Sequence, residues 1–369
     1  MPQVTDAPSS KTDEVRVLDL FAGAGGLTEG FRQASARFRS IGAVELDLSA
    51  AASYAANHGD SGLFVGPIET WLEQVDGVAA DVIVGGPPCQ GFSTLGKQDA
   101  EDERNGLWRS YAATIERVRP KYFVVENVAR FLVSPQLAQF REAVSDDGRL
   151  RDYTFEAREL NAADFGAGQA RRRAVLIGHH RDLPSPGFPE PTTLRTEWQT
   201  VRDRIGDLAD VAPHSALPER RTTFASRELP GTYLTSELHI ARTYRPLSLE
   251  RFAHIPYGGN RFDLPDHLLA RCWRSHKSGS ADVMGRLVWE KPSVTIRTEF
   301  FKPEKGRYLH PTAPRALTHL EAARLQGFPD DYRWVGSRTA IARQIGNAVP
   351  IALGKEIGRH ILQRLDQHA

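Results

Sequence analysis

The sequence VRVLDLFAGAGGLTEGFRQA occupies residues 15–34 and combines three local signals. Residues 15–21 are rich in apolar and β-branched side chains, which predicts a buried strand. A turn containing three glycines follows, and the pattern at 27–34 predicts a helix. Strand, glycine turn and helix form the first unit of a nucleotide-binding sheet, because glycines let a ligand approach the backbone and the helix N-terminus.

The spacing of the glycines and one downstream acid narrow the ligand class. Thr28 stands where a G-x-G-x-x-G pattern needs its third glycine, which argues against a dinucleotide and leaves room for another adenosine-containing ligand. A second predicted strand, 41–46, carries Glu45 about twenty residues after Gly25, where a carboxylate usually accepts hydrogen bonds from ribose hydroxyls. A helix-capping or solvent-facing Glu45 remains the alternative.

A second stretch, GGPPCQGFS at residues 85–93, follows the short apolar run 81–84. Its glycines permit unusual dihedrals and its prolines cannot continue a strand, so the chain must turn at once. Cys89 therefore stands on a stiff bend just past a strand end, where a thiol is suited to nucleophilic attack. A small buried residue in a tight turn is the alternative interpretation.

Strand and helix patterns go on alternating through the first half of the chain. Further strands are predicted at 63–65, 121–125, 153–160 and 174–177, and further helices at 49–57, 68–74, 107–118 and 136–144. This alternation predicts an α/β fold with a mostly parallel sheet. Because such strands point the same way, Asp19, Glu45, Cys89 and Glu126 should emerge along one edge. The polar segment 93–105 is predicted to be a loop that closes over a substrate.

The pattern changes near residue 183, where prolines become frequent and the alternation is lost until about residue 315. Within this irregular region short strands are predicted, such as the one at 293–298. A helix at 320–326 and a last amphipathic helix after residue 350 follow. The chain therefore divides into an ordered first domain, an irregular second region and a C-terminal segment.

Composition limits the classes of protein that this chain can be. Its 369 residues are 40% hydrophobic and 25% charged, which is ordinary for a soluble globular protein. No apolar run of about 18 residues and no secretory leader are present, so we expect a cytoplasmic protein without a membrane partner. The two cysteines cannot by themselves form a disulfide framework or a structural zinc site, and no metal is expected.

Positive charge is concentrated in one segment. Residues 241–310 contain 13 Lys or Arg against 7 Asp or Glu, whereas the remainder of the chain has a net charge of −5. This distribution indicates a surface for a polyanion, although a solvated charged surface would give the same count. The arginines at 171–173 are open to the same two interpretations, a solvated surface or a grip on phosphate and base.

The chain from residue 15 to its C-terminus resembles the cytosine-C5 DNA methyltransferase family, of the bacterial restriction-modification type. Six stretches carry the resemblance: DLFAGAGGLTEGF at 19–31, GGPPCQGFS at 85–93, ENV at 126–128, QARRR at 169–173, RALTHLEAARLQGFPDDY at 315–332 and QIGNAVP at 344–350. All six stand in the family's order, with a variable stretch between the fourth and the fifth. That combination is far more specific than any single stretch.

The resemblance implies a Rossmann-like S-adenosylmethionine-dependent methyltransferase sheet with a smaller, irregular target-recognition domain. It divides the chain into a flexible lead-in at 1–14, a catalytic domain at 15–185, a target-recognition domain at 186–340, and a segment at 341–369 that packs back on the catalytic domain. The substrate would be double-stranded DNA, and the cofactor would be converted to S-adenosylhomocysteine. The enzyme would be a monomer. A cognate restriction endonuclease acting on the same site is a possible partner.

The resemblance also implies roles for individual residues. Cys89 would be the nucleophile, Glu126 would bind cytosine N3, and Arg171 and Arg173 would contact the target nucleotide. The implied cofactor-binding residues are Phe21, Gly23, Gly25, Glu45, Leu46, Ile68, Pro87, Leu107 and Asn347. The expected DNA-binding residues are Ser93, Gln169, Arg261, Arg271, Arg274, Lys277, Arg286 and Arg297.

The chemistry requires these residue types. Carbon 5 of cytosine is too weak a nucleophile to take a methyl group directly, so a thiolate first adds at carbon 6 while an acid at N3 stabilises the electron density. The cytosine must also be flipped out of the duplex. One position departs from the family, which commonly has an acid near the adenine amino group where this chain has Pro67; Glu69 or a backbone carbonyl would replace it.

Two other functions are weighed against this one. An RNA cytosine methyltransferase would share the motifs, but the long 186–314 insert, suited to a duplex, argues against it. A DNA-binding module without catalysis would not need Cys89, Glu126, Arg173 and Asn347, all of which are intact. The recognised DNA sequence does not follow from these residues.

Overall fold

A seven-stranded sheet organises the first half of the protein in the computed structural model, which describes residues 14–88, 106–274 and 279–367. In spatial order the strands are β3 (Leu63–Val65), β2 (Phe38–Glu45), β1 (Val15–Leu20), β4 (Val82–Gly85), β5 (Tyr122–Val128), β8 (Arg172–His180) and β6 (Tyr153–Asn161). The first five are parallel, and β8 runs antiparallel to both of its neighbours. The predicted α/β fold with a mostly parallel sheet is confirmed.

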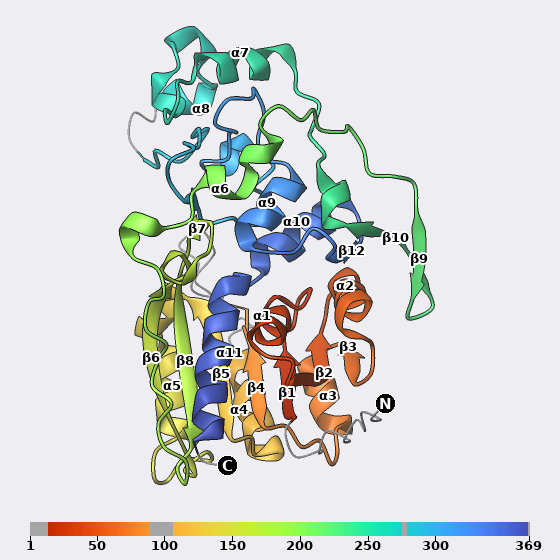
Figure 1. The fold of residues 1–369 in the computed structure, drawn as a ribbon, viewed down its shortest axis with the longest axis vertical. Coiled ribbons are helices and arrows are strands. Elements are labelled where there is room, and N and C mark those ends of the chain that lie inside the picture. The colour runs from red at the N-terminus through yellow and green to blue at the C-terminus, as the bar shows by residue number, and fades with distance from the viewer. Residues whose placement is uncertain (1–13, 89–105, 275–278, 368–369) are drawn as a thin grey trace, which may run out of the picture.

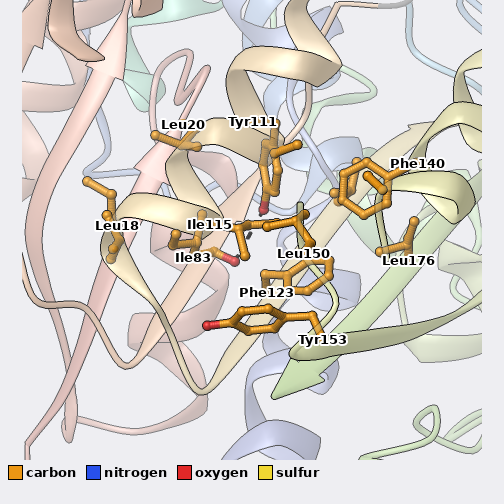
Figure 2. Packing of buried hydrophobic residues seen from close by; sticks show 14 of the residues in the cluster. Leu18, Leu20, Ile83, Tyr111, Ile115, Phe123, Phe140, Leu150, Tyr153 and Leu176 are labelled. Carbon is orange, nitrogen blue, oxygen red and sulfur yellow. Dashed lines mark hydrogen bonds between the residues drawn. The ribbon is translucent and has the colours of Figure 1, made fainter. Parts of the chain in front are cut away.

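Helices cover both faces of this sheet, since the buried strands are apolar on both sides. On one face lie α3 (Ile68–Gln74), α4 (Leu107–Val118) and α5 (Pro135–Ala143), and on the other α1 (Gly26–Ala34) and α11 (Ile351–Asp366). Figure 2 shows the core on the first face, where Tyr111 and Ile115 of α4 meet Ile83 and Phe123 of the sheet. The Tyr111 hydroxyl donates to the Val124 carbonyl at 2.8 Å, which satisfies its buried polar atom.

The second region lies beyond one end of the sheet in Figure 1. Its elements are α6 (Val201–Ile205), β9 (Arg221–Phe224), β10 (Arg227–Leu234), α7 (Pro246–His254), α8 (Arg271–Arg274), β11 (Ser293–Val294), α9 (His319–Gln326) and β12 (Arg333–Val335). Helix α10 (Arg338–Asn347) connects this region to α11 and contacts both α9 and α2 (Leu48–His58). Strands β12, β10 and β9 form a small antiparallel sheet, and β9 and β10 make a hairpin that projects from the body. The strand predicted at 293–298 is reduced to β11, which pairs with β7 (Gln169–Ala170).

Helix α10 was absent from the sequence-based prediction. Ser337 caps it, because the Ser337 hydroxyl accepts from the Ala340 amide at 3.3 Å, and the motif QIGN forms its last turn. Helix α2 (Leu48–His58) lies between this part and the sheet, in contact with α10 and β12 as well as β2. Among the described residues, no helix combines the length and apolar character needed to cross a bilayer.

Helices α1 and α11 approach each other closely along one line. A Cβ built on Gly30 would lie 2.8 Å from the backbone of Gly354, well inside van der Waals contact. A Cβ on Gly354 would instead have its nearest neighbour at 3.4 Å, an ordinary contact. The two glycines therefore differ in how much space they have, although they face each other.

We expect Gly30→Ala to lower the free energy of unfolding by about 1–3 kcal/mol, because it overpacks the contact between α1 and α11. Gly354→Ala is the matched control, and should be neutral or slightly stabilising because alanine favours helix. Urea unfolding of both variants measures the difference. Equal stabilities for the two variants would contradict the close approach of the helices.

Candidate active site

A cleft of about 1540 Å³ opens where the sheet meets the second region. From the sheet it is lined by the residues that follow β1, β2, β4 and β5, the carboxyl edge on which open parallel sheets place their ligand sites. From the other side it is lined by Val294, Arg297, Tyr308 and the end of α10. The cleft is thus built from segments that lie far apart in the sequence.

Glu45 is fixed at one end of this cleft by two backbone amides. Gly23 N donates to its Oε2 at 2.7 Å, and Asp47 N donates to its Oε1 at 2.7 Å. Burial raises the pKa of the Glu45 carboxyl, and the nearby Asp47 charge adds to that effect. Each oxygen can still accept a second hydrogen bond, so Glu45 could bind a pair of hydroxyl groups in the cleft.

The helix-capping alternative for Glu45 does not hold. It is Asp47 that caps α2, because Asp47 Oδ1 accepts from the amides of Ser49 and Ala50 at 2.9 and 3.0 Å. The neighbouring Leu46 lines the same cleft with an apolar side chain that is 69% exposed, and Phe21 and Ile68 also line it. Such a surface suits a flat aromatic ligand.

Of the residues predicted to bind a cofactor, all except Gly25 line the cleft. These are Phe21, Gly23, Glu45, Leu46, Ile68, Pro87, Leu107 and Asn347. Gly25 lies in the same turn but does not line the cleft. Its φ is 92°, and a Cβ on it would lie 2.6 Å from Nε2 of His58, so both the backbone conformation and the space favour glycine. Pro67 and Glu69 also line the cleft, and Glu69 Oε1 accepts from the Ser110 hydroxyl at 2.8 Å.

Glu126 and Arg173 meet at the other end of the cleft. Arg173 Nε lies 2.8 Å from Glu126 Oε1, and both side chains are largely buried. The pairing arises because β8 begins where β5 ends, with Arg173 opposite Val128. An acid held beside a cation in a cleft can bind a polar ring edge and stabilise charge that develops on it.

The turn that carries the predicted nucleophile is tied to this pair. Asn127 Nδ2 donates to the Pro87 carbonyl at 3.0 Å, which joins the end of β5 to the turn after β4. Asn127 had no predicted role, although it lies in the ENV stretch beside Glu126. Pro88 lines the cleft. Cys89, Ser93 and Lys277 lie outside the described residues.

Arg171 and Gln169 are buried and serve to join segments of the protein. Arg171 donates to the Ile296 carbonyl at 2.8 Å and to the Gly346 carbonyl at 3.1 Å. Gln169 donates to Gln326 Oε1 at 2.6 Å and accepts from the Ile296 amide at 3.1 Å. In the structure Gln169 and Arg171 are both buried in these contacts between segments, and their predicted contacts with DNA and with the target nucleotide stay predictions.

The predicted DNA-binding arginines divide into buried and exposed groups. Arg286 is buried and donates to the carbonyls of Phe252, Ile255, His310 and Ala313. Arg261 is also buried, with its guanidinium 4.5 Å from the ring centre of Phe262, and the DNA contacts predicted for both residues stay predictions. Arg271 and Arg274 are exposed on α8, and Arg297 lines the cleft.

Asp19 is a further buried acid on the cleft side of β1. Thr28 Oγ1 donates to its Oδ2 at 2.7 Å, and Thr28 and Tyr54 oxygens lie 3.2 Å apart. Burial raises the pKa of Asp19 to about 7, with the Glu45 charge contributing. Among all the residues that the structure describes, no group of three or more His, Cys, Asp or Glu is placed to hold a metal ion.

Comparisons with known proteins identify relatives over almost the whole chain. A model of the family described as C-5 cytosine-specific DNA methylase matches residues 15–363. Type II methyltransferase M.XorII of Xanthomonas oryzae pv. oryzae is 34% identical over 374 residues, which cover 94% of this chain and 84% of that protein. Type II methyltransferase M1.HphI of Haemophilus parahaemolyticus is also 34% identical, over 354 residues that cover 94% of this chain and 86% of that protein.

Solved structures share the fold. A prophage-encoded protein of E. coli gives a TM-score of 0.70 at 24% identity, covering 96% of this chain and all of the other. The Dnmt2 methyltransferase of S. pombe gives a TM-score of 0.57 at 17% identity, and the match covers 96% of this chain and 99% of the other. At these identities the likeness establishes the architecture alone.

The raised pKa of Asp19 predicts a pH dependence of stability. Its pKa is about 7 when folded and 3.8 ordinarily, so between these values the folded protein holds a proton that the unfolded chain has released. We expect the free energy of unfolding of the wild type, relative to Asp19→Asn, to fall by about 1–3 kcal/mol as the pH rises from about 4 to about 8. Urea unfolding across this range checks it, and parallel curves for the two proteins would contradict it.

Proposed function

The chain belongs to the C-5 cytosine-specific DNA methylase family, and we propose that it transfers methyl from S-adenosylmethionine to carbon 5 of a flipped cytosine in a specific duplex sequence, through a covalent bond from Cys89 to carbon 6. The family and its relatives make the chain a DNA cytosine-5 methyltransferase of the Type II restriction-modification kind. The observation that carries the proposal is the Glu126 and Arg173 pair, which shares one cleft with Glu45 and with Pro88, the neighbour of Cys89.

The end of the cleft around Glu45 fits S-adenosylmethionine. The anchored Glu45 carboxylate would accept hydrogen bonds from the two ribose hydroxyls, and Phe21, Leu46 and Ile68 offer apolar surface for adenine. Glu69, held by Ser110, stands in the cleft next to Pro67 and is the side chain we propose for the adenine amino group. When bound, the cofactor supplies an electrophilic methyl group on a sulfonium.

The remaining chemistry belongs to this chain's residues. The Cys89 thiolate adds to carbon 6, the displaced electron pair makes carbon 5 nucleophilic, and Glu126 stabilises N3 with a proton. After carbon 5 has gained its methyl group, it loses its proton to water, and the electron pair of that bond re-forms the double bond between carbons 5 and 6. The bond between carbon 6 and sulfur then breaks to restore the thiolate, and the N3 proton returns to Glu126. Arg173 keeps Glu126 in position, and its positive charge in the cleft favours a thiolate over a thiol.

Reaching carbon 6 requires the cytosine to leave the duplex, at a cost of a few kcal/mol. We propose that residues 15–185 hold both reacting groups, that residues 186–340 select the DNA sequence, and that 341–369 complete the first domain. The exposed Arg271 and Arg274 and the cleft residue Arg297 are the proposed DNA contacts among the described residues. The relatives' Type II class supports a cognate restriction endonuclease acting on the same DNA site.

We expect Cys89→Ser to abolish methyl transfer, because a hydroxyl is far less nucleophilic than a thiolate towards carbon 6. Transfer of labelled methyl to duplex DNA, and trapping of a covalent complex with 5-fluorocytosine-containing DNA, measure the effect. Cys272→Ser, at the only other cysteine, is the control and should keep both activities. Undiminished methyl transfer by the Cys89→Ser variant would contradict the proposed mechanism.

Glu126→Gln should lower the single-turnover rate of methyl transfer by about 10²–10⁴, because the amide cannot deliver a proton to N3. Glu159→Gln is the matched control, since Glu159 also pairs with an arginine on β8, Arg172, at 2.8 Å, but outside the cleft. Its rate should equal that of the wild type. Similar rates for both variants would remove Glu126 from the reaction.

A further inference from the structure

The glycine turn after β1 accepts a hydrogen bond from a residue 308 positions later in the sequence. The hydroxyl of Tyr332 donates to the Ala24 carbonyl, and Ala24 itself lines the cleft. One residue earlier, Gly23 donates its amide to Glu45, the carboxylate proposed for the ribose. The Tyr332 hydroxyl therefore acts on the same turn that orients Glu45.

A second residue fixes the direction of this hydrogen bond. His58, the last residue of α2, has its Nε2 3.0 Å from the Tyr332 oxygen. Since the phenol proton is donated to Ala24, the imidazole must donate its own Nε2 proton to the phenol oxygen. Burial lowers the pKa of His58 to about 4, which keeps the ring in its neutral form at physiological pH.

The ring of Tyr332 cannot easily move away from the turn. It is buried, and its centroid lies 4.8 Å from that of Phe328 and 5.2 Å from that of Trp334. Its carbonyl accepts from the amide of Thr235 at 2.8 Å, the first residue of the 3-10 helix Thr235–Leu238. The hydroxyl is thus placed by the packed core of the second region.

Helix α2 holds the strand that follows Tyr332. The side-chain amide of Asn57 donates to the Arg333 carbonyl at 2.8 Å and accepts from the Arg333 amide at 2.9 Å. The hydroxyl of Ser53 accepts from the Val335 amide at 2.7 Å. These side chains satisfy the free edge of β12 and fix Tyr332 relative to His58 on the same helix.

We propose that Tyr332 is a positioning residue for the cofactor turn, whose hydroxyl holds the Ala24 carbonyl and thereby keeps the Gly23 amide aligned with Glu45. The inference rests on the proposed function, because the turn matters only if a cofactor binds there. Without the hydroxyl, the binding-competent turn becomes one of several conformers. The apparent affinity for the cofactor then falls in proportion to the fraction of molecules whose turn can bind it. A saturating concentration of cofactor returns all molecules to the binding conformation.

The test is Tyr332→Phe, which keeps the packed ring and removes only the hydroxyl. Calorimetric titration with S-adenosylhomocysteine should give a dissociation constant about tenfold higher than that of the wild type, because two buried groups lose their partner. At saturating S-adenosylmethionine, the single-turnover rate should stay within about twofold of the wild type. His58→Phe should weaken cofactor binding in the same direction, but less.

Tyr153→Phe is the matched control. Tyr153 is equally buried and donates to the Pro120 carbonyl at 2.9 Å, at the opposite edge of the sheet from the cleft. It should lose stability without losing cofactor affinity. Equal weakening in both tyrosine variants, or a rate that stays low at saturation, would show a merely structural role and overturn the inference.

The titrations also separate this inference from the proposed function. If the wild type binds S-adenosylhomocysteine and Tyr332→Phe binds it equally well, only the role of Tyr332 fails. If the wild type does not bind it, the proposed cofactor fails and the role of Tyr332 with it. If Tyr332→Phe does not fold, His58→Phe decides, and wild-type affinity in that variant overturns the inference.

Discussion

The antiparallel pairing of β5 with β8 is the constraint on which the rest of the cleft depends. Parallel strands all end at one edge, so a parallel β8 would have carried Arg173 to the opposite edge from Glu126. Reversal of β8 instead brings its first residues beside the last residues of β5, with Arg173 opposite Val128. The ion pair between Glu126 and Arg173 in the cleft is therefore a direct consequence of strand direction.

The same reversal determines how the second region is attached. Gln169 and Arg171 precede β8 and consequently lie at the cleft edge, where both are buried against residues from the second half of the chain. Their hydrogen bonds reach Ile296, Gln326 and Gly346. A buried polar group without a partner is costly, so these hydrogen bonds favour the observed arrangement over arrangements that would break them. The polar contacts thus specify a geometry that apolar packing alone would leave loose.

Local patterns predicted much of this structure, and non-local contacts account for what they missed. The strands at 15–20 and 63–65 and the helices at 68–74 and 107–118 followed from short apolar runs and helical spacing. That the residues proposed to bind the cofactor line one cleft followed because they stand in motifs at strand ends. The burial of Arg286 and Gln169 could not be predicted, since charged and amide side chains are usually exposed and only tertiary contacts reveal their carbonyl partners. Helix α10 was not predicted because six of its ten residues, 338–343, precede the QIGNAVP motif and carry no motif of their own.

The glycine turn after β1, proposed to bind the cofactor, is held in its conformation by contacts from distant parts of the chain. Phe21 adopts a φ of 56°, a conformation that a bulky side chain enters at a cost of about 1–3 kcal/mol and that persists only when surrounding contacts enforce it. One such contact comes from Glu45 on β2 through the Gly23 amide, and another from Tyr332 through the Ala24 carbonyl. The second contact exists only when the segment after α9 is docked on α2. The conformation of the turn therefore depends on the assembled protein, which links the site on the first domain to the part proposed to read DNA.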